Sequence, residues 1–185
     1  METWLKRLIV STALIVGCLI GLSTSVNAQA SRTFPSRTIT YRITSSSPYY
    51  KSVWTKAIKR WNHLRVVKLV KADANAGMPD VQMTTTPGDK GSSYMLILDE
   101  GDDDAPSQRT TYKIQLYRKF MKSWYFDKGD RVQLATRTIG DVMGLKTSSD
   151  PNKFDSVMNT TTFSSAKPTK RDKKNLQKLY KNVAY

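Results

Sequence analysis

After residue 30 the chain contains no cysteine, so no disulfide bond can hold its fold together. Residues 31–185 are enough for one domain with a single hydrophobic core, and the fold must rely on that core. We therefore expect one domain over residues 31–185, stabilised by the packing of apolar side chains.

The first thirty residues have the composition of a secretory signal peptide. Lys6 and Arg7 form a positive start, Leu8–Leu22 is an apolar run broken only by small residues, and Ala28–Ala30 is a small-x-small cleavage site. The run is short for a membrane span and lacks a basic flank directly after it. We assign Cys18 to this apolar run; the alternative is a lipid-anchoring site. The sequence thus predicts a secreted, extracellular or wall-associated protein with no transmembrane segment after cleavage.

The chain is strongly basic, with 30 Lys and Arg against 15 Asp and Glu. Lys6, Arg7 and Glu2 belong to the predicted leader, which leaves a net charge of +14. Such a field attracts polyanions, and outside a cell these include anionic wall polymers and phospholipid headgroups. The simpler interpretation is that the charge only keeps the protein soluble. No motif for specific nucleic-acid binding accompanies it.

Two segments concentrate the positive charge. Residues 51–71 contain seven basic residues and no acidic one. The segment from Lys167 to Lys181 also contains seven basic residues, against Asp172 alone. Together they predict a surface that binds polyanions with a salt-dependent affinity.

Hydrophobic periodicity predicts an α+β domain. From Tyr50 to Trp61 the apolar residues recur at the spacing of an amphipathic helix, a second helix is predicted for Arg131–Leu145, and Thr169 is placed to cap a short third one. We expect a twisted mixed sheet of about four to five strands, covered by two long helices and a short C-terminal helix. The predicted strands are Thr38–Ile43, Val66–Val70, Val81–Thr85, Tyr94–Leu98 and Tyr112–Leu116.

Residues 135–158 contain glycines and a methionine at a characteristic spacing. The segment reads A-T-R-T-I-G-D-V-M-G-L-K-T from Ala135, and S-V-M follows at residues 156–158. This spacing resembles the H-E-x-x-H-x-x-G-x-x-H helix and the Met-turn of metzincin zinc proteases. The order of elements from about Thr38 to Tyr180 is similar to that of a small secreted bacterial matrixin-type domain. The resemblance implies a metzincin-like fold, with Gly144 as the turn glycine and Met158 as the Met-turn methionine.

The same resemblance implies a zinc metalloendopeptidase, but the zinc-binding and catalytic residues of the motif are replaced in this sequence. In the family, two histidines four residues apart bind zinc with a third, and the glutamate acts as general base. The three histidine positions fall here at Arg137, Asp141 and Thr147, and the glutamate position falls at Thr138. The degenerate motif therefore comprises Arg137, Thr138, Asp141, Gly144, Thr147 and Met158.

A count over the whole chain rules out a three-histidine zinc site in the monomer. The only histidine is His63, at the end of the first predicted helix. The only glutamates are Glu2 in the leader and Glu100 in an acidic loop. We expect no catalytic, cofactor-binding or metal-binding residues and no bound zinc, and we expect a monomer.

The replacements suggest new roles for the motif positions. Arg137 and Asp141 are four residues apart on one helix face, so we predict an ion pair across the former metal cavity. Alternatively, Arg137 and Lys146 bind an anion there. A third alternative is an active hydrolase whose metal site uses Asp141, Asp155 and water.

The acidic loop is a candidate calcium site, because calcium prefers clustered oxygen ligands. Its spacing does not match the EF-hand loop, so we expect a solvated turn. Its aspartates are Asp99, Asp102, Asp103 and Asp104.

The leading hypothesis from sequence is an inactive, secreted matrixin-like pseudoenzyme that binds the anionic cell envelope or a peptide. The alternatives are an active metal-dependent endopeptidase with non-standard ligands and a cationic envelope-binding protein.

Overall fold

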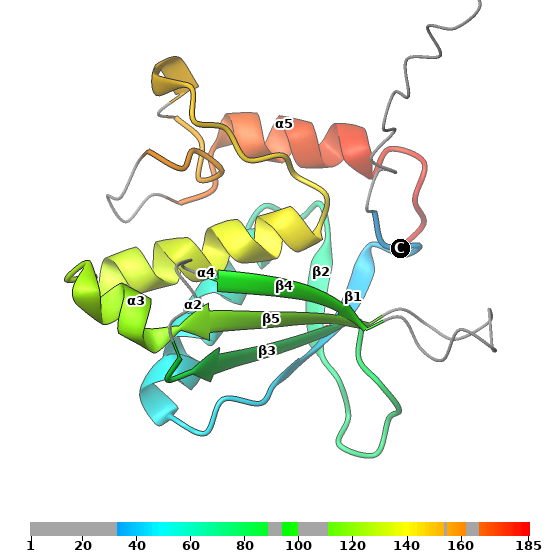
Figure 1. Ribbon diagram of the computed structural model, residues 1–185. Coiled ribbons are helices and arrows are strands. Elements are labelled where there is room, and N and C mark those ends of the chain that lie inside the picture. The colour runs from blue at the N-terminus through cyan, green and yellow to red at the C-terminus, as the bar shows by residue number, and fades with distance from the viewer. Residues whose placement is uncertain (1–32, 89–93, 100–110, 154, 162–166) are drawn as a thin grey trace, which may run out of the picture. The chain divides into compact units, whose positions relative to one another are not determined.

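A computed structural model of the chain describes residues 33–88, 94–99, 111–153, 155–161 and 167–185 (Figure 1). These residues belong to one compact unit that spans Arg32–Tyr185. The predicted signal peptide with Cys18, the glutamate Glu100 and the aspartates of residues 102–104 lie outside the described residues.

The strands form one mixed sheet in the order β2-β1-β3-β5-β4. β1 pairs in parallel with β2 and β3, and β3 pairs in parallel with β5. β4 runs antiparallel to β5 at the edge of the sheet (Figure 1). The predicted mixed sheet is therefore present, with strands at β1 (Thr38–Ile43), β2 (Lys68–Lys71), β3 (Val81–Thr86), β4 (Tyr94–Asp99) and β5 (Thr111–Tyr117).

Helices accompany the sheet, as predicted for an α+β arrangement. Two helices of 15 residues, α2 (Pro48–Asn62) and α4 (Lys128–Val142), pack against each other. The C-terminal helix α5 (Lys170–Leu179) has 10 residues. The described residues also include a short helix α3 (Arg118–Ser123) and a 3-10 turn η1 (Pro151–Lys153).

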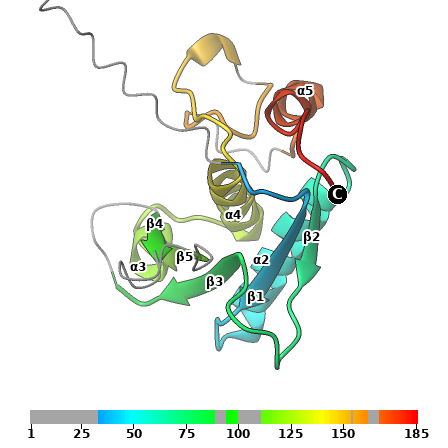
Figure 2. The ribbon, with the colours of Figure 1, turned by 90° about the vertical axis from the view of Figure 1, so that its right-hand side faces the viewer.

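Helix α2 forms because Pro48 can occupy a first-turn position and because its apolar residues share one face. Trp54 and Trp61 on that face are fully buried. Along each strand, successive side chains point to opposite faces of the sheet. On the inner face, Ile39, Met83 and the β5 residues Ile114 and Leu116 enter the same core as the two tryptophans. Figure 2 views the molecule at right angles to Figure 1 and shows α2 and α4 beside the sheet.

The two ends of the described domain are joined. The N–H of Arg37 donates to the carbonyl of Ala184 (2.8 Å), and the Arg37 guanidinium donates to the carbonyl of Tyr180 (2.7 Å). The Tyr180 side chain is fully buried. The C-terminal helix is thus tied to the segment that leads into β1.

Three local predictions need correction. β2 starts at Lys68 rather than Val66, because the chain first turns through Arg65, whose φ is 56°. α4 covers residues 128–142 rather than 131–145, since Asp127 caps it earlier than the apolar pattern indicated. α3 was not predicted; its six residues are too few for a visible period.

None of the described helices has both the length and the apolar character that crossing a membrane requires.

Candidate functional site

The motif positions lie on α4 and on the loop that follows it. The Asp127 carboxylate accepts a hydrogen bond from the N–H of Asp130 (2.8 Å), and the Asp130 carboxylate accepts one from the N–H of Asp127 (3.0 Å). This reciprocal cap starts the helix. At the other end, α4 stops at Val142 and Gly144 has a φ of 91°. Because glycine adopts this left-handed conformation readily, Gly144 turns the chain, as the spacing predicted.

Gly140 lies at a close contact among α4, α2 and the loop that carries Met158. A Cβ atom on Gly140 would be 2.5 Å from Sδ of Met158 and 2.8 Å from Cζ2 of Trp61. Both of these side chains are buried, and the Trp61 Nε1–H donates to the carbonyl of Thr136 (2.8 Å). Met158 therefore packs directly on α4, and only glycine leaves room for it.

We expect Gly140→Ala to lower the free energy of unfolding by about 1–2 kcal/mol, because overpacking costs about 1–3 kcal/mol and outweighs the roughly 1 kcal/mol that alanine gains in a helix. Urea unfolding followed by tryptophan fluorescence measures this change. Gly77→Ala is the control, since a Cβ there meets no atom within 4 Å. Unchanged stability of the Gly140 variant would contradict the close contact.

Arg137, at the first histidine position of the motif, is buried, with 4% of its surface exposed. Its Nε donates to the carbonyl of Val157 (3.1 Å), and its Nη2 donates to the carbonyl of Asn159. Hydrogen bonds from a charged donor contribute roughly 1.5–3 kcal/mol each. The guanidinium therefore fastens α4 to the segment around Met158, a role that the sequence did not indicate.

The other replaced positions differ in exposure. Thr138, at the glutamate position, is fully buried and its hydroxyl donates to the carbonyl of Leu134 (2.8 Å). Thr147 is exposed and Asp141 is partly exposed. Asp141 interacts with a neighbouring group. The ion pair between Asp141 and Arg137 stays a prediction.

A buried carboxylate on α5 holds the same segment from the opposite side. Asp172 is fully buried and accepts hydrogen bonds from the hydroxyl of Ser156 (2.5 Å) and the N–H of Val157 (3.0 Å). It also accepts one from the N–H of Thr169 (2.8 Å), at the start of α5. Asp172 thus completes the cap of α5 that was predicted at Thr169, and it also anchors the Met158 segment, which was not predicted.

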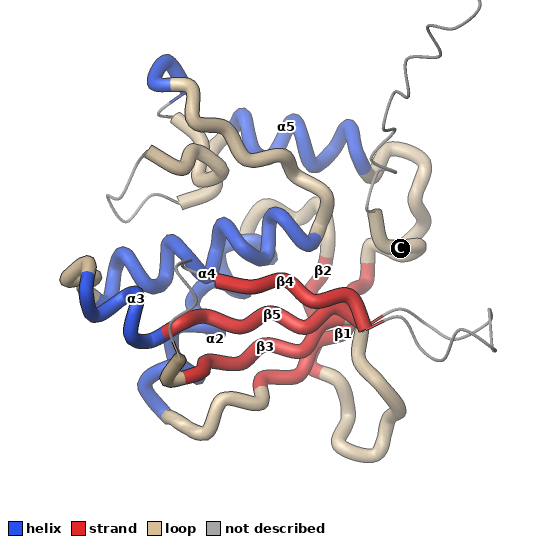
Figure 3. The backbone as a smooth tube through the Cα atoms, in the orientation of Figure 1, coloured by secondary structure: helices blue, strands red, loops and turns tan. Residues whose placement is uncertain are grey.

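Hydrogen bonds hold together the described part of the connection from α4 to α5, whose course Figure 3 shows. The N–H of Ser148 donates to the carbonyl of Met158 (3.1 Å), and the N–H of Thr160 donates to the carbonyl of Ser148 (2.8 Å). The Asn159 side chain donates to the carbonyl of Asp150 (2.8 Å). These bonds position Met158 against α4 although most of the described connection is irregular.

The side chains at the motif positions do not fit a zinc ion, which prefers imidazole, thiolate and carboxylate ligands in a tetrahedral set. Within the described part of the chain, no three His, Cys, Asp or Glu residues form a group that could hold a metal. His63 is exposed at the end of α2. Asp155, considered above as an alternative ligand, pairs with Arg171 (3.1 Å).

The alternative anion site at Arg137 and Lys146 gains no support. Arg137 uses its Nε and Nη2 on backbone carbonyls and is nearly inaccessible, whereas Lys146 is exposed. A candidate for anion binding lies elsewhere, between α2 and α4.

We call this second site the α2–α4 pocket. It has a volume of about 350 Å³, and four of its six lining residues are cationic while none is acidic. It is lined by Lys56, Lys59, Arg60, Lys128, Gly129 and Val132. The basic run on α2 was visible in the sequence, but the contribution of Lys128 was not, because it depends on how α4 packs on α2.

Cations stacked on two tyrosines adjoin the pocket. The Nζ of Lys128 lies 5.4 Å from the ring centre of Tyr49, and the Cζ of Arg131 lies 5.4 Å from the same point. The Cζ of Arg118 lies 6.0 Å from the ring centre of Tyr50. Burial raises the pKa of Tyr50, although Arg131 and Arg118 act to lower it, so this tyrosine adds no negative charge at neutral pH.

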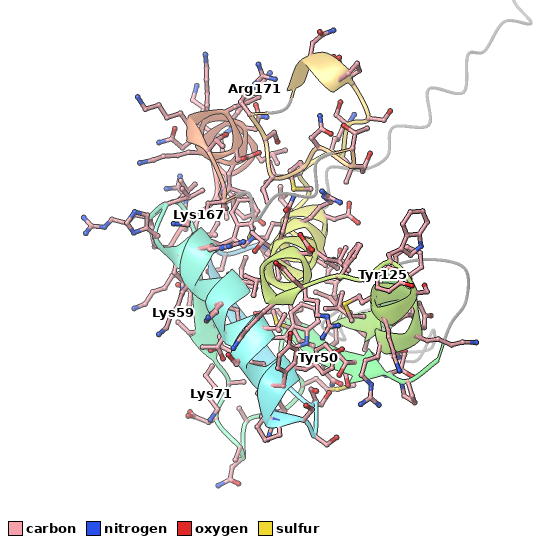
Figure 4. All side chains as sticks on the ribbon, turned by 90° about the vertical axis from the view of Figure 1, so that its left-hand side faces the viewer. Tyr50, Lys59, Lys71, Tyr125, Lys167 and Arg171 are labelled. Carbon is pink, nitrogen blue, oxygen red and sulfur yellow. The ribbon has the colours of Figure 1, made fainter. Side chains whose placement is uncertain are left out.

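Basic residues extend beyond the pocket on the same side of the molecule. Figure 4 shows this side, with Lys59 and Lys71 along α2 and β2 and with Lys167 and Arg171 above them, near the start of α5. Labelled residues of both basic segments of the sequence are therefore visible from this side of the molecule. Charges that share a face act together on a polyanion.

Comparison with known proteins assigns the chain to no group: no family model matches it, and no curated protein matches it.

Proposed function

We propose that this chain is an exported, matrixin-like protein that has lost its zinc site and acts by binding anionic polymers of the cell envelope. The observation that carries the proposal is the buried guanidinium of Arg137 at a motif position where the family has a zinc ligand. A cation fixed there by backbone carbonyls is incompatible with a second cation at the same place.

The family assignment within this proposal is supported by the arrangement of the elements. The five-stranded mixed sheet, the two long helices and the short C-terminal helix agree with the fold that the resemblance implies. The turn at Gly144 and the packing of Met158 against Gly140 agree with the motif. Spacing in sequence and contact in space thus support the same ancestry.

The binding role is supported by charge. α2 has four basic residues and no acidic one, and α5 has five basic residues against Asp172. Asp172 offsets one of these charges, so α5 keeps a net charge of +4. A cationic face of this kind attracts phosphate-bearing polymers through long-range electrostatics.

We expect the purified protein to be retained on immobilised poly(glycerol phosphate) at low ionic strength and released as salt rises, because the Debye length shortens from roughly 30 Å at 0.01 M to about 8 Å at 0.15 M. Column retention over a salt series measures this, with an uncharged dextran matrix as the control. Zinc content and peptide hydrolysis are measured on the same preparation.

The outcomes separate the alternatives. Stoichiometric zinc that a chelator removes, together with peptide cleavage that the chelator abolishes, would establish an active endopeptidase and overturn the proposal. Equal retention on the charged and the uncharged matrix would also contradict it, since charge would then not be the cause.

A further inference from the structure

The α2–α4 pocket concentrates positive charge in a concave site. Lys56, Lys59 and Arg60 approach it from α2, and Lys128 approaches it from the first turn of α4. Its volume of about 350 Å³ is that of a small ligand site. Four cationic side chains that border one pocket from two helices favour a compact, multiply charged anion over a single carboxylate.

We infer that the α2–α4 pocket is a phosphate-binding site, which receives phosphate groups of the anionic polymer. This inference rests on the proposed function, because it names the place where the ligand is held most tightly. It goes beyond that function in separating one specific site from the general positive field of the surface.

Partial burial of Arg60 favours an anion at this site. Burial lowers the pKa of the Arg60 guanidinium, because removal from water disfavours its charged form. Its Nη1 donates to the hydroxyl of Thr136 (3.5 Å). A phosphate oxygen nearby would stabilise the charged form of the guanidinium.

One of the cations that line the pocket, Lys128, has an aromatic neighbour. The Nζ of Lys128 lies over Tyr49, and the Nη1 of Arg131 donates to the Tyr49 hydroxyl (3.2 Å). Among the described residues, the buried Nε–H of Arg131 has no hydrogen-bond acceptor. Because the contact with Tyr49 already restricts the Lys128 side chain, Lys128 loses less conformational entropy when it binds a ligand, and this favours affinity.

The nearby acidic residues do not line the pocket. Asp127 and Asp130 are adjacent to Lys128, and each carboxylate accepts a hydrogen bond from the backbone N–H of the other residue. They partly offset the positive end of the α4 dipole. Even so, none of the residues that line the pocket is acidic.

The test compares two variants that lose the same charge. The pocket variant K56A/K59A/K128A and the α5 variant K173A/K174A/K178A each remove three lysines, all of them exposed. Lysine and alanine both favour helices, so we expect both variants to fold, and circular dichroism checks this. Affinity is measured by titration with poly(glycerol phosphate) and with polyglutamate of similar length, which carries charge but no phosphate.

We expect the pocket variant to bind poly(glycerol phosphate) on the order of ten-fold more weakly than the wild type, because it loses contacts to phosphate as well as general charge. The α5 variant should lose less than about three-fold, since its lysines contribute only to the long-range field. Polyglutamate should bind both variants equally. In NMR spectra, pyrophosphate should shift the Gly129 amide of the wild type and not that of the pocket variant.

Each result decides one question. If the two variants lose affinity equally for both polymers, the pocket inference is wrong and the proposed function stands. If the wild type binds neither polymer, the proposed function itself fails. An unshifted Gly129 amide in the wild type, with binding intact, would also overturn the inference.

Discussion

The triple variant R137H/D141H/T147H should bind zinc, whereas the wild type should not. These substitutions restore the three histidine positions of the motif: two are four residues apart on α4, and the third follows the turn at Gly144. Three imidazoles at this spacing form a zinc site in proteins with this motif. The gain would be large, because the wild type presents a buried guanidinium in place of the first imidazole.

Zinc content after dialysis and competition with a chelator measure the gain. The double variant R137H/D141H is the matched control, since it lacks the third ligand and should hold zinc more weakly. Circular dichroism must show that the triple variant is folded, because Arg137 also stabilises the contact between α4 and the Met158 segment. A folded triple variant that binds no zinc would contradict the proposed matrixin ancestry, since the spacing of these three positions would then not reflect the zinc-site geometry of the family.

Asp172→Asn is expected to lower the free energy of unfolding by about 3 kcal/mol, because hydrogen bonds to a charged group contribute roughly 1.5–3 kcal/mol each. The carboxylate accepts hydrogen bonds through both oxygens, from Ser156 and Val157 and from Thr169. An asparagine keeps the shape and one acceptor oxygen, but its N–H₂ group cannot accept, so one of these hydrogen bonds is lost and the others no longer have a charged acceptor. Chemical denaturation measures the loss.

Asp155→Asn is the control for the loss of charge alone. Asp155 pairs with Arg171 at the surface, where 59% of the Asp155 side chain is exposed, so its substitution should change stability by at most about 1 kcal/mol. Equal effects of the two substitutions would show that Asp172 does not anchor the Met158 segment.

Much of the secondary structure follows from local patterns. β1 has the predicted bounds, because alternation of Ile39, Tyr41 and Ile43 is a period-two signal. α2 contains the whole predicted stretch from Tyr50 to Trp61, since its apolar stripe is continuous. α4 was displaced by three residues, because its start depends on the Asp127–Asp130 cap rather than on apolar residues.

The candidate site was less predictable. A sequence places Arg137 and Asp141 on the same helix face, but it does not show which groups lie opposite that face. The carbonyls of Val157 and Asn159 meet Arg137 only because the connection from α4 to α5 folds back against the helix. Arg137 is 20 and 22 residues from these two acceptors in the sequence, and contacts at such a separation have no periodic signal.

By itself, the sequence determined the strands and long helices, the turn at Gly144, the basic character of α2 and α5, and the lack of histidines for a zinc site. These properties depend on composition and on spacing along the chain. Only the tertiary structure decided that Gly140 makes room for Met158 and Trp61, that Asp172 anchors the Met158 segment, and that Lys128 joins α2 in a basic pocket. Those features arise from residues that are distant in sequence, and packing of the core brings them together.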